Sequence, residues 1–337
     1  MSEIRLDLLN DHYVLISPER LHKPDTHHVV QKKDSNPLCP FCEGNEDLTP
    51  PEIFALRDNA PNADMWRTRV VPNLYKAVQI ELEAKSSRDG MFEMFSGVGA
   101  HEVLIDSPNH NAVFWKMETQ NITNWLDSLV FRINDLKKDD RLIYLNIFKN
   151  SGRESGATQE HPHTQLLALP MMPKNILSFF KRDMKYYETH GRGIVEDLLN
   201  QELQSGQRII ARSREFVAYC PYASSFSFEV MIAPTSDIAN LNLCSRVQID
   251  ELSNLIKKVF IALNKHLGEF DFNLSFQNSA LNENFENQKY FKHMQHHHRF
   301  TLRIMPRIYR LGGFELSTSM AINPVSPEDC ARLLRGD

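Results

Sequence analysis

No stretch of this 337-residue sequence approaches the roughly 18 consecutive apolar residues that indicate a membrane-spanning helix. The N-terminal segment also lacks the basic region, apolar stretch and small-residue cleavage site of a secretory signal. Hydrophobic residues make up 42% of the chain and charged residues 24%, as in ordinary globular proteins. We therefore expect a cytoplasmic protein that does not act in a membrane.

A net positive charge and clusters of basic residues are absent as well. The formal net charge is -5, and the sequence contains neither a run of basic residues nor a basic patch interleaved with aromatic residues. Because nucleic-acid binding depends on such surfaces, nucleic acid is excluded as a partner. Anionic ligands must then be held by a local site.

Cysteine is rare, and its five positions do not form a disulfide framework, because the number is odd and most are isolated. Only Cys39 and Cys42 lie close together, in a Cys-x-x-Cys within a turn-rich segment. This spacing lets both thiolates face one tetrahedral metal ion, which would need two more ligands from elsewhere. A redox pair, or two unrelated thiols, are the alternatives.

Hydrophobic periodicity indicates two similar halves. In the first half, apolar residues spaced on one helical face predict a helix over about 118–137, and in the second half a helix over about 245–267. Prolines at residues 169–175 interrupt the pattern, so we place the domains at 1–172 and 173–337. Short alternating or apolar runs predict strands at 12–17, 67–73, 101–107 and 142–148, and again at 216–222, 228–234, 272–278 and 299–307.

The segment 150–170 carries the strongest local signal. A loop rich in small residues leads into His161-Pro-His163-Thr-Gln165 and then into an apolar run. On a strand, both histidines project from one face, so one can bind a metal while the other does chemistry. Neutral imidazole is a good nucleophile toward phosphorus. The alternative is an ordinary histidine pair in a chain with 14 histidines.

The loop before these histidines is suited to phosphate. Gly152 and Gly156 can present backbone N–H groups to phosphate oxygens, and Thr158 and Gln165 can add neutral donors.

Seven ordered blocks together resemble the galactose-1-phosphate uridylyltransferase family, a branch of the histidine-triad superfamily, and within it the plant-type ADP-glucose phosphorylase branch. The resemblance covers nearly the whole chain. Its blocks are IRLDLLNDHYVLISPER, CPFCEGNE, VVPNLYKAV, GAHEVLIDSPNH, the His-Pro-His-Thr-Gln segment, SFSFEVMIAP and GGFELSTSMAINPVSPEDCARLL.

The resemblance implies specific roles for residues of this sequence. The nucleophile falls on His163, with Gln165 on the phosphoryl group, and zinc positions the strand rather than the reacting atom. The implied Zn²⁺ ligands are Cys39, Cys42, His110 and His161. The implied substrate contacts are Asn150, Thr158 and Gln165 for phosphate, with the Gly156 loop beside them, Asn73 for the nucleotide, Arg20 and Lys23 as basic contacts, and Glu315 for sugar hydroxyls.

Relatives often carry a second metal site, and here the match is incomplete. Glu202 aligns with its carboxylate ligand, but the expected alternating histidines fall on Arg299 and Thr301. His296, His297 and His298 lie just upstream, so the site is lost, shifted or rebuilt. Three adjacent side chains cannot all point one way on a strand, and a polar surface or interface segment is the alternative for this cluster.

The fold expected from the resemblance is α+β, with two tandem histidine-triad-like units, each an antiparallel sheet with helices packed on one face. The expected reaction moves a nucleoside monophosphate from a nucleotide sugar to a hexose 1-phosphate through a covalent nucleotidyl-histidine, as in UDP-glucose:hexose-1-phosphate uridylyltransferases. A phosphorylase that uses ADP-glucose and inorganic phosphate is the second reading, and a non-catalytic nucleotide-binding protein the third. The resemblance also implies a homodimer. The sequence does not decide between uracil and adenine.

Overall fold

The computed structural model describes residues 2–22, 39–282 and 294–337. Lys23, one of the expected basic contacts, lies outside the described residues. Every strand and helix predicted from the hydrophobic pattern is present, within a few residues of its expected ends. No described helix is both long enough and apolar enough to cross a membrane.

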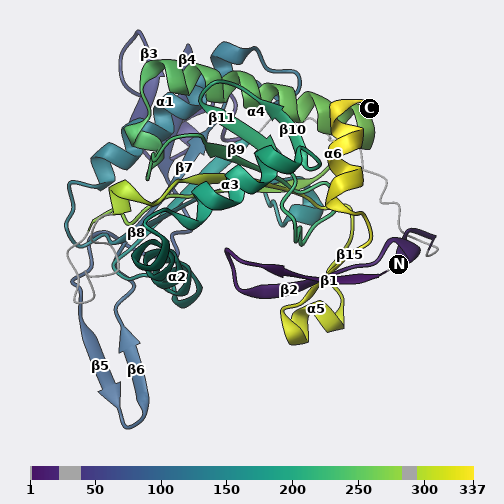
Figure 1. Ribbon diagram of the computed structural model, residues 1–337. Coiled ribbons are helices and arrows are strands. Elements are labelled where there is room, and N and C mark those ends of the chain that lie inside the picture. The colour runs from purple at the N-terminus through teal and green to yellow at the C-terminus, as the bar shows by residue number, and fades with distance from the viewer. Residues whose placement is uncertain (1, 23–38, 283–293) are drawn as a thin grey trace.

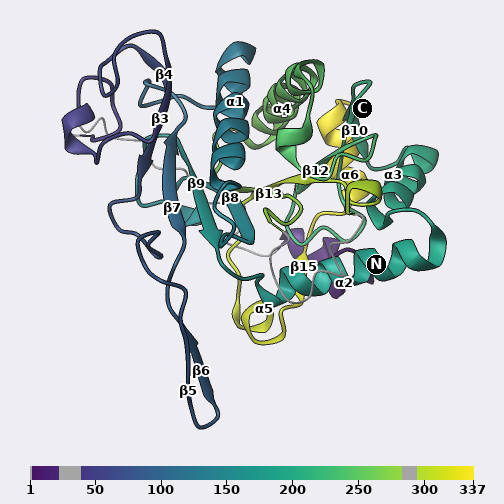
Figure 2. The ribbon, with the colours of Figure 1, turned by 90° about the vertical axis from the view of Figure 1, so that its left-hand side faces the viewer.

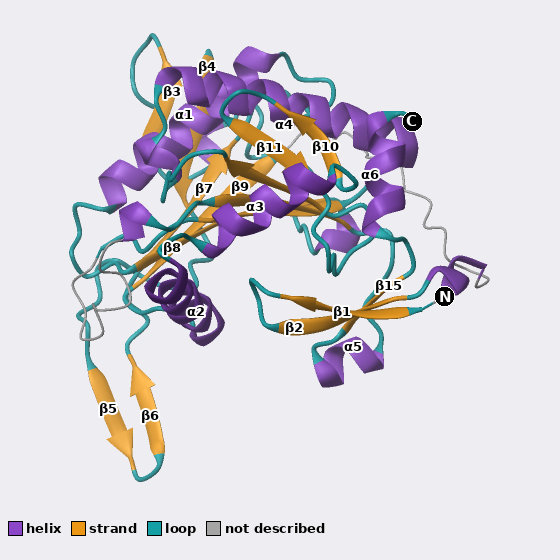
Figure 3. Cartoon of the chain, viewed as in Figure 1, coloured by secondary structure: helices purple, strands orange, loops and turns teal. Residues whose placement is uncertain are grey.

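Ten strands form one antiparallel sheet, in the order β10-β11-β12-β14-β13-β8-β9-β7-β4-β3 (Figures 1 and 3). The order of the second half mirrors that of the first, and the halves meet where β13 pairs with β8. The strands are β3 (Phe54–Arg57), β4 (Trp66–Pro72), β7 (Ala100–Ile105), β8 (Tyr144–Ser151), β9 (His163–Leu169), β10 (Ile209–Arg212), β11 (Phe216–Tyr219), β12 (Val230–Pro234), β13 (Phe272–Gln277) and β14 (Thr301–Pro306).

Two long helices, α1 (Thr119–Leu136) and α4 (Arg246–Leu267), lie side by side on one face of this sheet (Figure 2). Ser245 starts α4 with a capping box, in which its hydroxyl and backbone N–H both bond to Gln248. Each fully buried Leu or Ile of this layer contributes about 1.5–3 kcal/mol. The layer includes Ile122, Trp125, Leu126 and Leu129 of α1, Ile256 and Val259 of α4, and Leu104, Ile147, Leu166, Leu274 and Ile304 of the strands.

The opposite face differs between the halves. On β11 and β12 it is also apolar, and it is covered by α2 (Lys174–His190) and α3 (Ile194–Ser205). Helices therefore lie on both faces of the second half, not on one as expected, because both faces of its strands are hydrophobic. On β8 and β9 of the first half, the same face carries the polar side chains Asn150, His163 and Gln165.

A small second sheet joins the two ends of the chain. Strand β2 (His12–Ile16) pairs on one side with β1 (Glu3–Asp7) and on the other with β15 (Ala321–Asn323). In the sequence, β15 lies between the short helix α5 (Gly313–Thr318) and α6 (Pro327–Arg335). The expected division at residue 172 falls between β9 and α2 and stays a prediction. The first strands nevertheless pack with the second half, since the Arg5 guanidinium donates to Glu328 and to the Tyr222 carbonyl.

One hairpin projects from the body of the protein. It consists of β5 (Ser86–Asp89) and β6 (Phe92–Phe95) (Figures 1 and 2). All of its strand residues are exposed.

Candidate functional site

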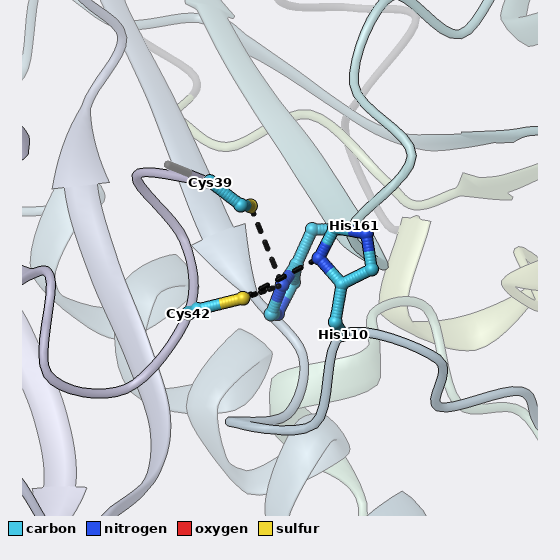
Figure 4. A group of neighbouring side chains, drawn as sticks. All are labelled: Cys39, Cys42, His110 and His161. Carbon is cyan, nitrogen blue, oxygen red and sulfur yellow. Dashed lines mark hydrogen bonds between the residues drawn. The ribbon is translucent and has the colours of Figure 1, made fainter. Parts of the chain in front are cut away.

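Four side chains from three distant segments converge beside the start of β9 (Figure 4). Cys39 and Cys42 lie in a turn closed by the Cys42 N–H, which donates to the Cys39 carbonyl at 3.2 Å. His110 follows β7, and His161 precedes β9. One ligand atom from each of the four lies within 4.8 Å of all the others. The four ligands implied by the resemblance are thus together.

The spacing fits a tetrahedral ion. With metal–sulfur distances of about 2.3 Å and metal–nitrogen distances of about 2.05 Å, a tetrahedron places sulfur and nitrogen roughly 3.6 Å apart. The Cys42 Sγ atom lies 3.4 Å from His110 Nδ1 and 3.6 Å from His161 Nδ1, and Cys39 Sγ lies 3.8 Å from His161 Nδ1. The residues present therefore form a Cys2His2 set that can hold a metal.

The electrostatics of the group also favour a cation. The His161 Nε2–H donates to the Ser107 carbonyl at 2.8 Å, which leaves the Nδ1 lone pair for a metal. Burial lowers the pKa of His161 to about 4, so the ring is neutral, as a ligand must be. Burial and the neighbouring Cys39 raise the pKa of Cys42 to about 11. A bound cation would offset this cost of forming thiolates.

His163 lies two residues after His161 and is only 6% exposed. Its Nδ1–H donates to the His161 carbonyl at 2.8 Å, so Nε2 keeps its lone pair. Burial lowers the pKa of His163, and the positive charge of Lys149 lowers it further. Both effects favour the neutral ring. The Phe41 ring packs against the imidazole, with 5.6 Å between centroids. His163 is thus a neutral imidazole with one free, fixed nitrogen.

A buried ionic network holds the strand behind His163. Lys149 Nζ donates to Asp106 Oδ2 at 2.6 Å and to the His163 carbonyl at 3.1 Å. Asp106 Oδ1 accepts a hydrogen bond from Thr164 Oγ1 at 2.8 Å. The sequence analysis missed Lys149, although it shares a strand face with Leu145 and Ile147. A lysine on an otherwise apolar strand face indicates that its ammonium group has a buried, oppositely charged partner.

Gln165 is oriented by a residue that the sequence analysis also missed. His101 Nδ1 accepts the Ala77 backbone N–H at 3.1 Å, so the proton of the neutral ring is on Nε2. This Nε2–H faces Gln165 Oε1 at 3.1 Å. Asn73 Nδ2 lies equally near the same nitrogen but cannot donate to a nitrogen that carries a proton. The bond from His101 occupies the Gln165 oxygen and leaves the amide N–H groups as donors.

Asn150 is oriented in the same way, on β8 beside His163 of β9. The Asn273 amide nitrogen donates to the Ser155 carbonyl at 2.9 Å, which identifies it as nitrogen, and to Asn150 Oδ1 at 2.8 Å. The Asn150 oxygen is therefore occupied, and its N–H groups are the donors that remain. Two amides whose N–H groups remain as donors thus lie on the same sheet face as His163, Gln165 on β9 and Asn150 on the neighbouring β8, an arrangement that suits a phosphate group.

The remaining expected contacts are placed as follows. Gly156 has φ of 84° at the end of the loop, and Thr158 is exposed beside it. Asn73 is half-buried after β4, next to His101. Arg20 is exposed in the N-terminal segment, and Glu315 caps α5 by accepting the Gly312 N–H at 2.9 Å. The described contacts do not link these last two residues to His163.

The residues expected around a second metal have other partners. Glu202 accepts two hydrogen bonds from Arg208 at 3.0 and 2.9 Å. Arg299 donates to Asp237 at 2.8 Å. Within the part of the chain that the structure describes, the group around Cys39 is the only cluster of three or more potential Cys, His, Asp or Glu ligands.

The histidine cluster is divided. His296 is exposed, but His297 and His298 are buried, so the surface alternative is wrong for these two. Their Nδ1 atoms lie 3.3 and 3.0 Å from Asp183 Oδ2 of α2. Although burial opposes it, the contacts with both histidines, including the hydrogen bond from His298, lower the pKa of Asp183 to about 2. The cluster anchors α2 to the segment before β14.

Comparison with known proteins gives sequence and structural matches. Residues 1–173 match the family described as galactose-1-phosphate uridyl transferase, N-terminal domain. The chain is 31% identical to the ADP-glucose phosphorylase of Arabidopsis thaliana, over 99% of this chain and 92% of that protein. It is 27% identical to the galactose-1-phosphate uridylyltransferase of Thermotoga maritima, over 99% and 98%. A crystal structure of an Arabidopsis thaliana ADP-glucose phosphorylase with bound ADP-glucose matches with a TM-score of 0.84 at 31% identity, covering 100% of this chain and 99% of that chain.

Proposed function

This chain belongs to the galactose-1-phosphate uridyl transferase family, and we propose that it transfers a nucleoside monophosphate from a nucleotide sugar to a phosphate-bearing acceptor through a covalent intermediate on His163. One observation carries the proposal. The Nδ1–H of His163 is bonded to the His161 carbonyl, and the same sheet face carries Asn150 and Gln165, whose amide oxygens are occupied and whose N–H groups remain as donors.

The first step is an in-line attack by the neutral Nε2 of His163 on the α-phosphorus of the nucleotide sugar. The phosphorus–nitrogen bond forms, and the bond from phosphorus to the bridging oxygen breaks. That oxygen leaves with its electron pair as part of sugar 1-phosphate. Because this leaving group is weakly basic, the step needs no strong general acid.

Positive charge develops on the imidazole as the phosphorus–nitrogen bond forms. The Nδ1–H of His163 then becomes a stronger donor to the His161 carbonyl, so the existing 2.8 Å hydrogen bond stabilises the charged ring. Donors from Asn150, Gln165 and the Gly156–Thr158 loop are suited to the equatorial oxygens. In the second step, an oxygen of the acceptor phosphate attacks phosphorus, and His163 recovers its electron pair.

The Cys2His2 group fits Zn²⁺ in a closed structural site. Four protein ligands leave no open position for substrate, so bound zinc would supply rigidity rather than a reacting water. It would tie the turn at Cys39 and Cys42 to His110 and to His161, whose carbonyl holds His163. The turn also carries Phe41, which packs against the His163 ring.

Two reactions fit this chemistry, and they differ in donor and acceptor. From the sequence we expected the UDP-glucose:hexose-1-phosphate uridylyltransferase reaction first and the ADP-glucose phosphorylase reaction second. Identity to the Arabidopsis thaliana phosphorylase, at 31%, exceeds that to the Thermotoga maritima uridylyltransferase, at 27%. This difference favours the second reaction. The oriented His163 site argues against a non-catalytic binding protein.

The test uses UDP-glucose and ADP-glucose, each labelled at the α-phosphate, with galactose 1-phosphate or inorganic phosphate as acceptor. We expect acid-labile label on the protein from one donor, and release of that label by one acceptor. Release from the uridylyl form by galactose 1-phosphate identifies the uridylyltransferase. Release from the adenylyl form by phosphate identifies the phosphorylase. The absence of label from both donors would contradict the proposed function.

Replacing His101 with phenylalanine is expected to lower kcat by about 10- to 100-fold, because Gln165 loses the donor that fixes its amide. The combined substitution with Gln165→Ala should be no slower than Gln165→Ala alone, since both remove one function. Steady-state kinetics of the single and double variants test this. Independent, multiplicative effects would show that His101 acts other than through Gln165.

The sites for the sugar and for the partner copy remain proposals. We propose that Arg20, Lys23 and Glu315 contribute to substrate binding and that the protein is a homodimer, as the resemblance implies. Light scattering of the purified protein tests the dimer.

A further inference from the structure

The reaction brings two phosphate groups to His163, yet the cation nearest to the nucleophile strand is already neutralised. Lys149 is 3% exposed, and its ammonium is paired with Asp106 on the helix-covered side of the sheet. The side chains of His163 and Asn150 project from the opposite side. Binding a phosphate dianion there calls for a second cation on that side.

Arg307, one residue after β14, lies on this side. Its Nη1 donates to Asn273 Oδ1 at 3.4 Å, and Asn273 in turn donates to Asn150. Asn273 is paired with Asn150 in the β13–β8 register. Phe148 is paired with Gln165 in the β8–β9 register, so Asn150, two residues further, lies beside His163. The sheet therefore places Asn273, Asn150 and His163 in one row across β13, β8 and β9, and the Arg307 side chain reaches this row at Asn273.

The guanidinium of Arg307 is held in place but not neutralised. It stacks over the Phe226 ring at 5.1 Å, and its buried Nε has no hydrogen-bond partner. Among the described residues, no carboxylate forms an ion pair with it. The nearest acidic influence is Glu154, whose carboxylate is paired with Arg310 at 2.6 Å. The neighbouring Arg303 on β14 is likewise paired, with Glu229.

We propose that Arg307 binds the phosphate group that leaves with the sugar in the first step and the acceptor phosphate in the second. The Arg307 side chain reaches back across β13 to Asn273, which contacts Asn150 beside His163. A diphosphate with its α-phosphorus at His163 and its second phosphate over Asn150 therefore faces the Arg307 guanidinium. Guanidinium groups match phosphate oxygens in geometry and charge. The inference rests on the proposed function and names the residue that holds the second phosphate.

In this scheme the acceptor oxygen attacks the α-phosphorus while Arg307 neutralises the remaining oxygens of the acceptor. The phosphorus–oxygen bond forms, and the phosphorus–nitrogen bond to His163 breaks with its electron pair returning to Nε2. Hexose 1-phosphate and inorganic phosphate present the same dianionic group, so Arg307 serves either acceptor. Water, which carries no phosphate, gains nothing from Arg307.

The experiment starts from wild-type protein and the Arg307→Gln and Arg307→Lys variants, each labelled on His163 by the active donor. Release of label is followed against the concentration of galactose 1-phosphate, against that of inorganic phosphate, and in water alone. For Arg307→Gln, the half-saturating concentration of the active acceptor should rise about 10- to 100-fold, the loss expected for one charged hydrogen bond. Arg307→Lys, which keeps the charge, should lie between. Release by water should stay within about twofold of wild type.

Arg214→Gln, which removes one positive charge from an exposed side chain, is the matched control and should behave as wild type. An unchanged acceptor dependence in Arg307→Gln overturns the inference while leaving the proposed function intact. An equal loss of release by acceptor and by water also overturns it, because Arg307 would then act only by supporting Asn273 and Asn150. If wild type takes no label from either donor, the proposed function fails first, and this inference fails with it.

Discussion

Replacing His163 with alanine is expected to lower nucleotidyl transfer by at least about 10⁴-fold, because a two-step displacement without its nucleophile has no covalent route. Acid-labile label should disappear from the protein as well. Quantitative transfer assays and label counting on purified protein measure both effects. Thermal unfolding and metal content must be measured alongside, since the ring is buried and packs against Phe41.

The matched control is His266→Ala, which removes an exposed histidine from the last turn of α4. It should label and turn over as wild type does. A folded His163→Ala protein that takes up label as wild type does would place the nucleophile elsewhere. Loss of label together with loss of metal would show that the substitution disturbs the neighbouring site, and His163→Asn would then be the variant to compare.

Local sequence pattern was sufficient for eight of the strands and for the two long helices. The helices α1 and α4 follow from apolar residues repeated every three or four positions, and the Ser245 capping box marks the start of α4. Each of the eight predicted strands could be recognised from a short alternating or apolar run of residues. These signals lie within the segment that they describe, so no tertiary information was required.

The joining of the two halves could not be predicted in this way. The sheet is continuous because β13 pairs with β8, strands more than 100 residues apart in sequence. Pairing and register depend on non-local contacts that no local pattern encodes. Helices cover both faces of β11 and β12, with α4 on one side and α2 and α3 on the other. This arrangement also depends on packing between segments distant in sequence.

The candidate site likewise contains residues that the sequence predicts and residues that only the structure brings together. His163 and the four proposed metal ligands were predicted because their motifs resemble those of a known family. Asn273 was missed because it lies in none of the blocks that carry the resemblance. His101 lies in the block GAHEVLIDSPNH, but no role was inferred for it there. Each acts by occupying the oxygen of a neighbouring amide, and strand register alone decides that neighbour. The partner of His297 and His298, Asp183, comes from a helix more than 100 residues earlier.

Replacing Cys42 with serine is expected to abolish metal binding and to destabilise the protein by more than about 4 kcal/mol, as loss of a structural metal can. The site connects the turn at Cys39 to His110 and to His161, so its loss frees the turn from β9. Transfer should fall too, because Phe41 and the His161 carbonyl both position His163. Metal analysis, denaturant unfolding and transfer assays test the three effects, and prolonged chelation of wild type should reproduce them.

Cys244→Ser is the control, because Cys244 is a partly buried thiol outside the Cys2His2 group. It should keep full metal content. Full zinc occupancy in Cys42→Ser would show that the four residues do not form the site. Loss of zinc with unchanged stability and transfer would show that the ion is bound but does not hold the turn. Loss of zinc and of transfer with retained folding would show that the ion acts mainly on the position of His163. The two segments that the ion would join carry Phe41 and His161, which both contact the His163 ring.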